Sequence, residues 1–431
     1  MDRESVLLSG KRIRFLMKHF IIDKKEGNIY MLKVTLNDVK KAQETIKGIV
    51  KETPVLESKI LSEMTGANVF YKCENLQKTG SFKVRGAVNT IANLTDEQKS
   101  KGVIASSAGN HAQGVALGAQ MTGIKATIVM PATAPLAKVS ATRGYGAEVV
   151  LNGEVYDDAY AKAVEIQKET GATFIHPFNN EYVMAGQGTI SLEIFEQLNN
   201  EVDTIICPIG GGGIIAGVAV AAKALNPNVK IIGVQTSNIP SMQESLKNGQ
   251  VTTAFNGATI ADGIAVKTPG NDTFEIIKEL VDEVITVTEE EIAEGMLFLL
   301  EHQKITSEGA GAVSTAALLS KKYKPVDGEK IVCIVSGGNV DVNTLSKTIR
   351  IALFKSGRRF TFNTDIQDKP GGLAELTKIL SKLEANIIEV NLSSNNDLGR
   401  LSAYMVLETF NHDHIAKIKR EIEEAGFKVA E

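Results

Sequence analysis

Short apolar runs alternate with amphipathic stretches along most of this chain. Runs of strand length occur at residues 68–73, 102–106, 125–130, 147–151, 173–177, 204–209, 230–235 and 330–335. Stretches of helical periodicity lie between them, among them 35–50, 83–94, 111–122, 157–170, 184–199 and 214–225. This alternation predicts an α/β architecture with mostly parallel sheets. Such sheets bind ligands beyond the carboxyl ends of their strands, so the loops that follow strands are where chemistry is expected.

The pattern changes near Gly357. From there the chain reads strand, helix, strand, strand, helix and a last short strand, with a turn "QDKPGG" at 367–372 and another at 394–399. This is the β-α-β-β-α-β order of a ferredoxin-like unit. The helix predicted at 341–355 is the connector. We therefore expect a main α/β domain of two subdomains at 31–350 and a small domain at 351–431.

Residues 1–30 fit neither domain. Their stretch "KRIRFLMKHFIIDKK" is basic and mildly amphipathic. Its apolar runs are too short and too charged for a signal peptide or a membrane span. We expect a loosely ordered extension outside the functional core.

Composition narrows the class of partner. The 431 residues include 47 basic and 51 acidic residues, a net charge of −4, and 43% are hydrophobic. A nucleic-acid or anionic-membrane binder would need a basic patch, so a small-molecule ligand is expected instead. The three cysteines stand in apolar runs without metal-ligand spacing, which predicts buried thiols, no zinc site and a reducing cytoplasm.

Three loops of small residues follow predicted strands: "SSAGNHAQG" at 106–114, "PIGGGGIIAG" at 208–217 and "SGGN" at 336–339. The run Gly210 to Gly213 precedes a helix, so its N–H groups and the positive helix end would form an anion site suited to a phosphate. A tight strand-helix turn is the simpler alternative. Gly211, Gly213 and Ala216 also match a dinucleotide fingerprint, but the following strand ends at Gln235, where that interpretation requires an acidic residue.

The stretch "KTGSFKVRGA", residues 78–87, places Lys83 at a predicted helix start. A cation is disfavoured there by the helix dipole, which lowers the lysine pKa and favours a neutral, nucleophilic amine. A phosphate site together with such a lysine suggests pyridoxal phosphate. From its position alone, Lys83 could equally be a solvated surface residue.

The four motifs, in this order, resemble the fold-type II pyridoxal-phosphate enzymes, and most closely the threonine ammonia-lyases (threonine dehydratases). The resemblance covers about residues 31–350 and implies two open, twisted, mostly parallel sheets with flanking helices. The segment with "DKPGGLAEL" resembles an ACT regulatory domain, as in the medium-length form of this lyase. The resemblance implies elimination of water from L-threonine to give 2-oxobutanoate and ammonia, and from L-serine to give pyruvate.

The resemblance also assigns roles. Lys83 would be the Schiff-base lysine, Phe82 would lie against the cofactor ring, and Asn110 would bind the ring hydroxyl. The phosphate would be held by Gly210, Gly211, Gly212 and Gly213. Ser336 would face the pyridine nitrogen as a neutral partner, which favours elimination over transamination. Ser107, Asn110 and His111 would surround the substrate carboxylate, although His111 and Ser107 could instead make only local hydrogen bonds.

Three further positions refine the expectation. Related serine racemases carry a serine at position 108, whereas Ala108 cannot donate a proton, so negligible racemisation is expected. Gln235 is a poor ligand for a divalent cation, so no metal is expected there. Glu308 is expected near the cofactor or as a helix cap.

The ACT-like segment implies regulation. Such domains pair and bind amino acids, so a homo-oligomer (dimer or tetramer) with isoleucine as effector is expected; a purely structural pairing domain is the alternative. Other β-eliminating enzymes of this fold, such as a serine dehydratase, stay open as functions. A nicotinamide-dependent dehydrogenase and a non-catalytic amino-acid sensor are opposed by Gln235 and by the intact motifs, respectively.

Overall fold

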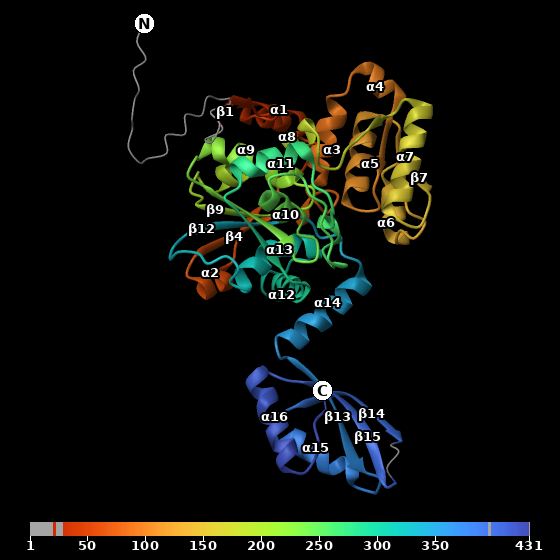
Figure 1. Ribbon diagram of the computed structural model, residues 1–431, viewed down its shortest axis with the longest axis vertical. Coiled ribbons are helices and arrows are strands. Elements are labelled where there is room, and N and C mark those ends of the chain that lie inside the picture. Colours follow the sequence, from red (N-terminus) through yellow and green to blue (C-terminus); the bar gives the residue numbers. More distant parts are fainter. Residues whose placement is uncertain (1–19, 23–28, 395–397, 431) are drawn as a thin grey trace.

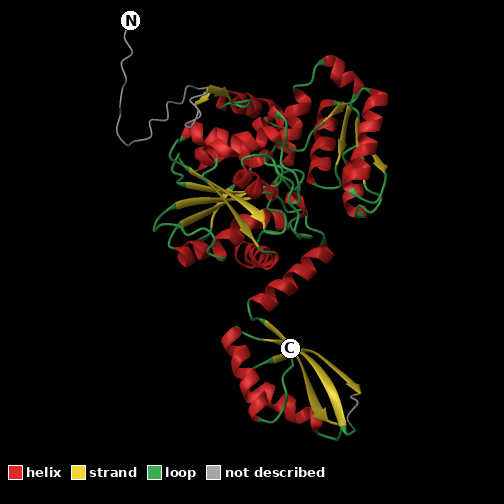
Figure 2. Cartoon of the chain, in the orientation of Figure 1, coloured by secondary structure: helices red, strands yellow, loops and turns green. Residues whose placement is uncertain are grey.

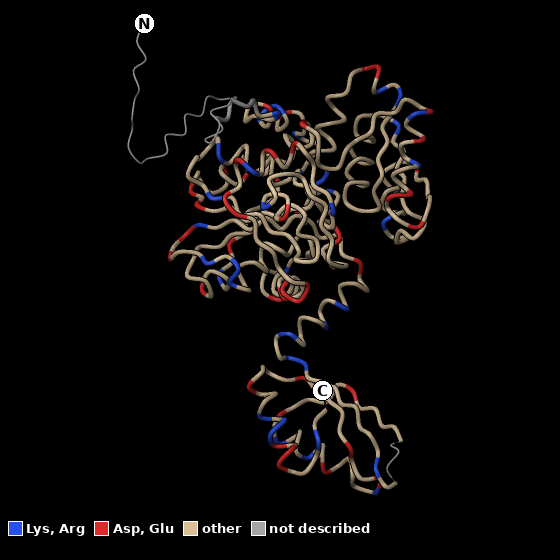
Figure 3. Tube along the Cα trace, in the orientation of Figure 1, with Lys and Arg blue, Asp and Glu red and all other residues tan. Residues whose placement is uncertain are grey.

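The computed structural model describes residues 20–22, 29–394 and 398–430. Two α/β units lie side by side, and a smaller C-terminal unit is joined to them through one helix (Figure 1). In both α/β units, helices enclose a sheet (Figure 2). Lys and Arg positions are mixed with Asp and Glu positions over the described parts of all three units (Figure 3).

The larger unit contains a six-stranded sheet in the order β11-β10-β9-β12-β4-β3. Neighbouring strands are parallel except for β3 and β4. The strands are β3 (Val55–Glu57), β4 (Asn68–Cys73), β9 (Thr204–Pro208), β10 (Lys230–Thr236), β11 (Glu283–Val287) and β12 (Lys330–Val335). The pattern of apolar runs predicted the four inner strands. It missed the two edge strands: β3 has only three residues, none of them buried, and in β11 buried positions alternate with partly exposed ones.

Helices cover both faces of this sheet. Those of the larger unit are α1 (Leu36–Ile46), α2 (Lys59–Thr65), α8 (Glu181–Gln197), α9 (Gly213–Leu225), α10 (Ser241–Asn248), α11 (Asn271–Leu280), α12 (Glu289–Phe298) and α13 (Gly309–Leu319). Alternate residues of β12 enter opposite cores: Val332 and Ile334 pack in one, and Ile331 and Val335 in the other. All three cysteines are buried and free, which confirms the prediction of buried thiols.

The smaller unit contains a parallel four-stranded sheet in the order β7-β6-β5-β8. Its strands are β5 (Val103–Ser106), β6 (Ala126–Met130), β7 (Glu148–Leu151) and β8 (Thr173–Phe174), and its helices are α3 (Lys83–Ala92), α4 (Asp96–Lys101), α5 (Asn110–Thr122), α6 (Leu136–Gly144) and α7 (Tyr156–Thr170). The strand predicted at 173–177 was too long. It stops after Phe174 because His176 Nδ1 accepts the N–H groups of Phe178 and Asn179 and turns the chain.

The connector is α14 (Val342–Lys355), close to the helix predicted at 341–355. Beyond it, the C-terminal unit contains β13 (Arg359–Gln367), α15 (Gly372–Lys382), β14 (Asn386–Ser394), β15 (Arg400–Glu408) and α16 (His412–Glu424). Its antiparallel sheet has the order β13-β15-β14. The predicted last strand is shortened to one bridge between Ala430 and Asn363.

The predicted extension at 1–30 lies mostly outside the described residues. Within it, β1 (Phe20–Ile22) pairs antiparallel with β2 (Ile29–Met31). The first helix begins at Leu36, where Thr35 and Asp38 form a capping box. Among the described residues, no helix is long and apolar enough to cross a membrane.

Candidate active site

A cavity of about 900 Å³ opens between the two α/β units. It is lined by the loops that follow β5, β6, β9 and β12 and by the start of α3, at the carboxyl ends of the strands as expected. Every site residue predicted from the sequence lines it: Phe82, Lys83, Ser107, Asn110, His111, Gly210, Gly211, Gly212, Gly213 and Ser336. The fold therefore brings together residues that are up to 254 positions apart, from Phe82 to Ser336.

The loop that carries Lys83 is joined to the loop after β12. Phe82 N donates to Ser336 O at 3.1 Å, and Gly338 N donates to Gly80 O at 2.9 Å. Asn339 Nδ2 adds a hydrogen bond to Thr79 O at 2.7 Å. These contacts hold the two loops side by side, so Ser336 and Lys83 line the same cavity.

Lys83 is the first residue of α3, as predicted. Its Nζ donates to Pro177 O at 2.9 Å and lies 5.2 Å from the centre of the Phe82 ring. Burial lowers the pKa of Lys83 to about 8, although the nearby Glu308 carboxyl opposes that shift. A substantial share of the amine is thus neutral near pH 8, which is the form that a nucleophile or a base requires.

A buried ion cluster anchors the helix of Lys83. Arg85 lies between Glu74 and Glu193, with Nη2 2.8 Å from Glu74 Oε1 and from Glu193 Oε2. Lys72 Nζ also contacts Glu193 Oε2 at 2.6 Å. The four side chains carry two charges of each sign and come from β4, α3, α8 and the residue after β4. They hold α3 against the larger unit, and no pattern along the chain predicted them.

The glycine run has unused donors. Gly210, Gly211 and Gly212 are buried, and their N–H groups have no acceptor among the described residues. They precede α9, whose N-terminus adds a positive dipole end. A Cβ on Gly211 would lie 2.4 Å from the Phe178 ring, and Gly212 has φ 97°. Donors that need an acceptor, in a backbone that excludes side chains, fit a phosphate group.

Ser107, Asn110 and His111 stand at the N-terminus of α5. Ser107 Oγ accepts Gly109 N at 3.1 Å. His111 Nε2 lies 2.8 Å from Ile175 O, a carbonyl that can only accept, so this nitrogen carries the proton. Burial, with Lys83 nearby, lowers the pKa of His111 to about 3. The neutral ring therefore has no second N–H to offer a carboxylate, whereas Ser107 and Asn110 retain donors.

Glu308 faces the cavity. It occupies the N-cap position of α13 but makes no capping hydrogen bond; its Oε1 instead accepts Asn110 Nδ2 at 2.7 Å. Glu308 was expected either near the cofactor or as a helix cap, and its side chain lies in the cavity rather than capping α13. Burial, with Asp262 nearby, raises the pKa of Glu308 to about 7. Asp262 in turn pairs with Lys138 at 3.0 Å across the two units.

Ala108 and Gln235 are the two positions expected to distinguish this chain from the related serine racemases. Ala108 lines the cavity and offers no proton. Gln235 is buried, and its Oε1 accepts the N–H groups of Met242 and Gln243 at 3.0 Å each. No group of three metal-ligating side chains occurs among the described residues. Gln235 therefore acts as a structural cap for α10.

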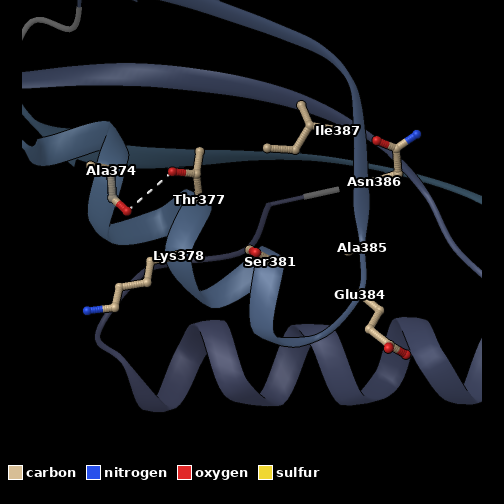
Figure 4. A pocket seen from close by; sticks show the side chains of 8 residues that line it. All are labelled: Ala374, Thr377, Lys378, Ser381, Glu384, Ala385, Asn386 and Ile387. Carbon is tan, nitrogen blue, oxygen red and sulfur yellow. Dashed lines mark hydrogen bonds between the residues drawn. The ribbon is translucent and has the colours of Figure 1, made fainter.

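A second hollow lies on the C-terminal unit, between α15 and the start of β14 (Figure 4). Its polar side chains do not converge: Lys378 and Glu384 extend in different directions, and Thr377 Oγ1 is bonded to Ala374 O at 3.2 Å. The side chains whose pKa values are shifted by burial, Lys83, His111 and Glu308, lie instead in the cavity between the α/β units. We take this cavity as the active site.

Comparisons with known proteins agree with this geometry. The family model described as pyridoxal-phosphate dependent enzyme matches residues 46–337. An L-threonine ammonia-lyase of Thermotoga maritima is 51% identical over 399 residues, which cover 92% of this chain and 99% of the relative. Two solved structures are similar. Maize serine racemase has a TM-score of 0.70 at 41% identity, covering 75% of this chain and 99% of the racemase. The processed threonine deaminase isoform 2 of Solanum lycopersicum has a TM-score of 0.70 at 38% identity, covering 74% of this chain and 87% of the deaminase.

The match of the family model spans well over half of the chain and includes the loops that line the cavity. The relative from Thermotoga maritima is matched over almost its whole length. The chain therefore belongs to the pyridoxal-phosphate dependent enzymes and, within them, to the family of the threonine ammonia-lyases.

Proposed function

We propose that this protein is an L-threonine ammonia-lyase, which converts L-threonine to 2-oxobutanoate and ammonia and also converts L-serine to pyruvate and ammonia. The observation that carries the proposal is the partly buried Lys83, whose pKa is lowered, in the same cavity as a glycine run whose N–H groups have no acceptor in the part of the chain that the structure describes. The similarity to a threonine ammonia-lyase over 92% of the chain supports it.

The cofactor is pyridoxal phosphate, which, when bound, withdraws electrons from the α-carbon of an amino acid. We assign its covalent attachment to Lys83 and its phosphate to the N–H groups of Gly210, Gly211, Gly212 and Gly213. Phe82 would lie against its ring, Asn110 would donate to the ring hydroxyl, and Ser336 would face the ring nitrogen. Ser336 Oγ now donates to Ala310 O at 3.3 Å, a long bond that a better acceptor could replace.

We assign the removal of the substrate's α-proton to Lys83. With a pKa of about 8, its Nζ can accept the α-proton of the substrate and is regenerated when that proton is released. The Cα–H and Cβ–O bonds break and water leaves; hydrolysis of the resulting enamine product returns one water and releases ammonia. Pro177 O, 2.9 Å from Nζ, would orient the amine while it is free.

The substrate carboxylate is assigned to the start of α5. The Ser107 hydroxyl and the backbone N–H of Asn110 would supply donors, because the two side-chain hydrogens of Asn110 are assigned to Glu308 and to the ring hydroxyl. The helix N-terminus also favours a negative charge. His111 would shape this subsite rather than donate to it, because its Nε2 proton is bonded to Ile175 O.

Two related activities are alternatives. A serine dehydratase would use the same residues, and only the relative rates on threonine and serine separate the two. A serine racemase is suggested by the structural similarity to the maize enzyme. Ala108 opposes it because a racemase must return a proton to the opposite face of the α-carbon, and a methyl group cannot do so.

The C-terminal unit is assigned to regulation. We propose that it binds an amino-acid effector, with isoleucine as the first candidate, and that it supports a homo-oligomeric assembly in the cytoplasm. Arg358, at the end of the connector, contacts Glu301 of the larger unit at 2.8 Å, which offers a mechanical link between the units. A titration of the rate against isoleucine and the other branched-chain amino acids tests this part, and an unchanged dependence on threonine concentration would remove it.

The activity itself is tested by adding pyridoxal phosphate and L-threonine to the purified protein and measuring 2-oxobutanoate and ammonia. Equal amounts of the two products are expected. L-serine should give pyruvate, without accumulation of D-serine. If neither keto acid forms and D-serine does, the racemase alternative replaces the proposal.

A further inference from the structure

We propose that His176 is a positioning residue, which holds the Pro177 carbonyl against Lys83 and so sets the direction of the reacting amine. The inference rests on the proposed function for Lys83. It concerns the turn at residues 176–179, immediately after β8, where a continuation of the strand was predicted from the sequence.

The His176 ring organises this turn through one nitrogen. Its Nδ1 accepts Asn179 N at 2.9 Å and Phe178 N at 3.2 Å. A nitrogen that accepts two N–H groups carries no proton, so the turn requires the neutral ring. Burial, followed by the influence of Lys83, lowers the pKa of His176 to about 4, which keeps the ring neutral at physiological pH.

The turn directs one carbonyl toward the reacting lysine. Pro177 lies between the histidine and the two N–H groups that it binds, and its ring fixes its own φ. Its carbonyl oxygen accepts Lys83 Nζ at 2.9 Å. Proline also leaves no N–H in the turn that would need a partner. The position of the acceptor of Lys83 is therefore determined by the His176 Nδ1 contacts.

The same turn contacts the glycine run. Phe178 packs edge-on against His176, with ring centres 4.7 Å apart, and lies where a side chain on Gly211 would be. Asn179 Oδ1 accepts Asp272 N at 2.9 Å, and Thr273 Oγ1 donates to Gly211 O at 2.6 Å. One histidine thus supports a turn that touches both the lysine and the proposed phosphate site.

A direct role in proton transfer is disfavoured by position. The His176 side chain is not among the described residues that line the cavity, whereas Pro177 and Phe178 are. Its effect must reach the substrate through the turn. This distinction can be tested, because an asparagine side chain can accept the same two N–H groups in an Asx-type turn but cannot act as a base.

The test compares His176→Asn, which keeps an acceptor, with His176→Leu, which removes it. The rate on L-threonine and on L-threonine deuterated at the α-carbon is measured for both variants and for the parent enzyme. We expect His176→Asn to retain kcat within about threefold. His176→Leu should lose about tenfold to a hundredfold in kcat, the scale for a misplaced catalytic group. Its deuterium isotope effect should rise, because removal of the α-proton becomes slower than the other steps.

A second readout uses the cofactor-free protein. The rate at which an amine-specific reagent modifies Lys83 is measured by mass spectrometry relative to Lys125, whose side chain is 76% exposed. His176→Leu should change this relative rate several-fold, while His176→Asn should leave it near the parent value. This readout needs no catalysis, so it separates failure of the inference from failure of the proposed function, which would appear as an inactive parent enzyme.

The outcomes are decisive in either direction. Equal losses in folded His176→Asn and His176→Leu, or parental kinetics and Lys83 modification in His176→Leu, would overturn the positioning role. If His176→Leu does not fold, His176→Ala replaces it. If His176→Ala does not fold either, His176→Asn alone tests the positioning role. Retained activity in that variant supports the role, and a loss of more than about tenfold in a folded protein refutes it.

Discussion

Asn339 determines which way the Asn110 amide faces. Asn339 Nδ2 must be the donor to Thr79 O, and the same nitrogen lies 2.8 Å from Asn110 Oδ1. The other side of the Asn110 amide is therefore its NH₂ group, which donates to Glu308 Oε1 at 2.7 Å. The orientation of a side chain assigned to cofactor and substrate thus follows from the Thr79 carbonyl, in the loop that precedes Lys83.

Asn339→Asp should disturb this arrangement. A carboxylate cannot donate to Thr79 O, and it would face the Asn110 carbonyl oxygen unless that amide turned over. Polar groups left without partners in this partly buried network cost about 1–3 kcal/mol, so we expect activity to fall about tenfold. The control is Asn68→Asp, which loses an exposed side-chain hydrogen bond to Gly328 O away from the cavity. Equal activities in the two variants would contradict the role of Asn339.

Glu308→Gln should stabilise the cofactor-free protein at high pH. The folded-state pKa of Glu308 is raised to about 7 from 4.5. The carboxyl therefore supports folding below pH 4.5, and this support is lost as the pH rises toward 7. A neutral glutamine escapes the loss and can still accept Asn110 Nδ2. The advantage should grow to about 3 kcal/mol above pH 7.

Urea unfolding of both proteins near pH 4.5 and at pH 8 measures this difference. The free energies of unfolding should nearly coincide at the lower pH and diverge at the higher one. A difference that does not depend on pH would mean that Glu308 titrates normally. Activity is expected to fall in the same variant, because the carboxyl lies beside Asn110 and Lys83.

Gly211→Ala should impair cofactor binding. The added methyl group would lie 2.4 Å from the Phe178 ring, so either the ring or the glycine run must move. We expect at least tenfold weaker binding of pyridoxal phosphate, measured by titration of the apoenzyme. Gly144→Ala is the matched control, since its methyl group would meet no atom within 4 Å. Parental affinity in both variants would contradict the assignment of the phosphate.

Arg85→Met should destabilise the fold. The change leaves Glu74 and Glu193 buried with only Lys72 to compensate them. Breaking a buried ion pair from one side costs about 3–5 kcal/mol, whereas an exposed pair contributes little because water screens it. Lys101→Met, which removes an exposed partner of Glu97, is the control. Thermal and urea unfolding of both variants provide the comparison.

The sequence predicted the parts of this protein that depend on local pattern. The inner strands are continuous apolar runs, and the glycine run and the position of Lys83 at the start of α3 are visible in single short stretches. The strands β3 and β11 were missed because β3 has only three residues and β11 alternates between buried and partly exposed positions. The last strand was overestimated, since only one bridge forms at Ala430.

Other parts of the site could not be found from pattern because they depend on distant contacts. Arg85 meets Glu193 across 108 residues, and Asn110 meets Glu308 across 198. His176 was assigned to a strand, since nothing in "TFIHP" shows that its ring would bind two N–H groups farther along. Glu308 looked equally suited to capping α13 until its side chain was seen to face the cavity.

The central claim is that Lys83 carries the cofactor. The most direct measurement reduces the cofactor-loaded protein with borohydride, which makes the linkage permanent, and identifies the modified peptide by mass spectrometry. The added mass should lie on Lys83 alone, and a Lys83→Ala variant should retain none. A modified lysine elsewhere, such as the buried Lys72, or a loaded protein without any modified lysine, would contradict the account.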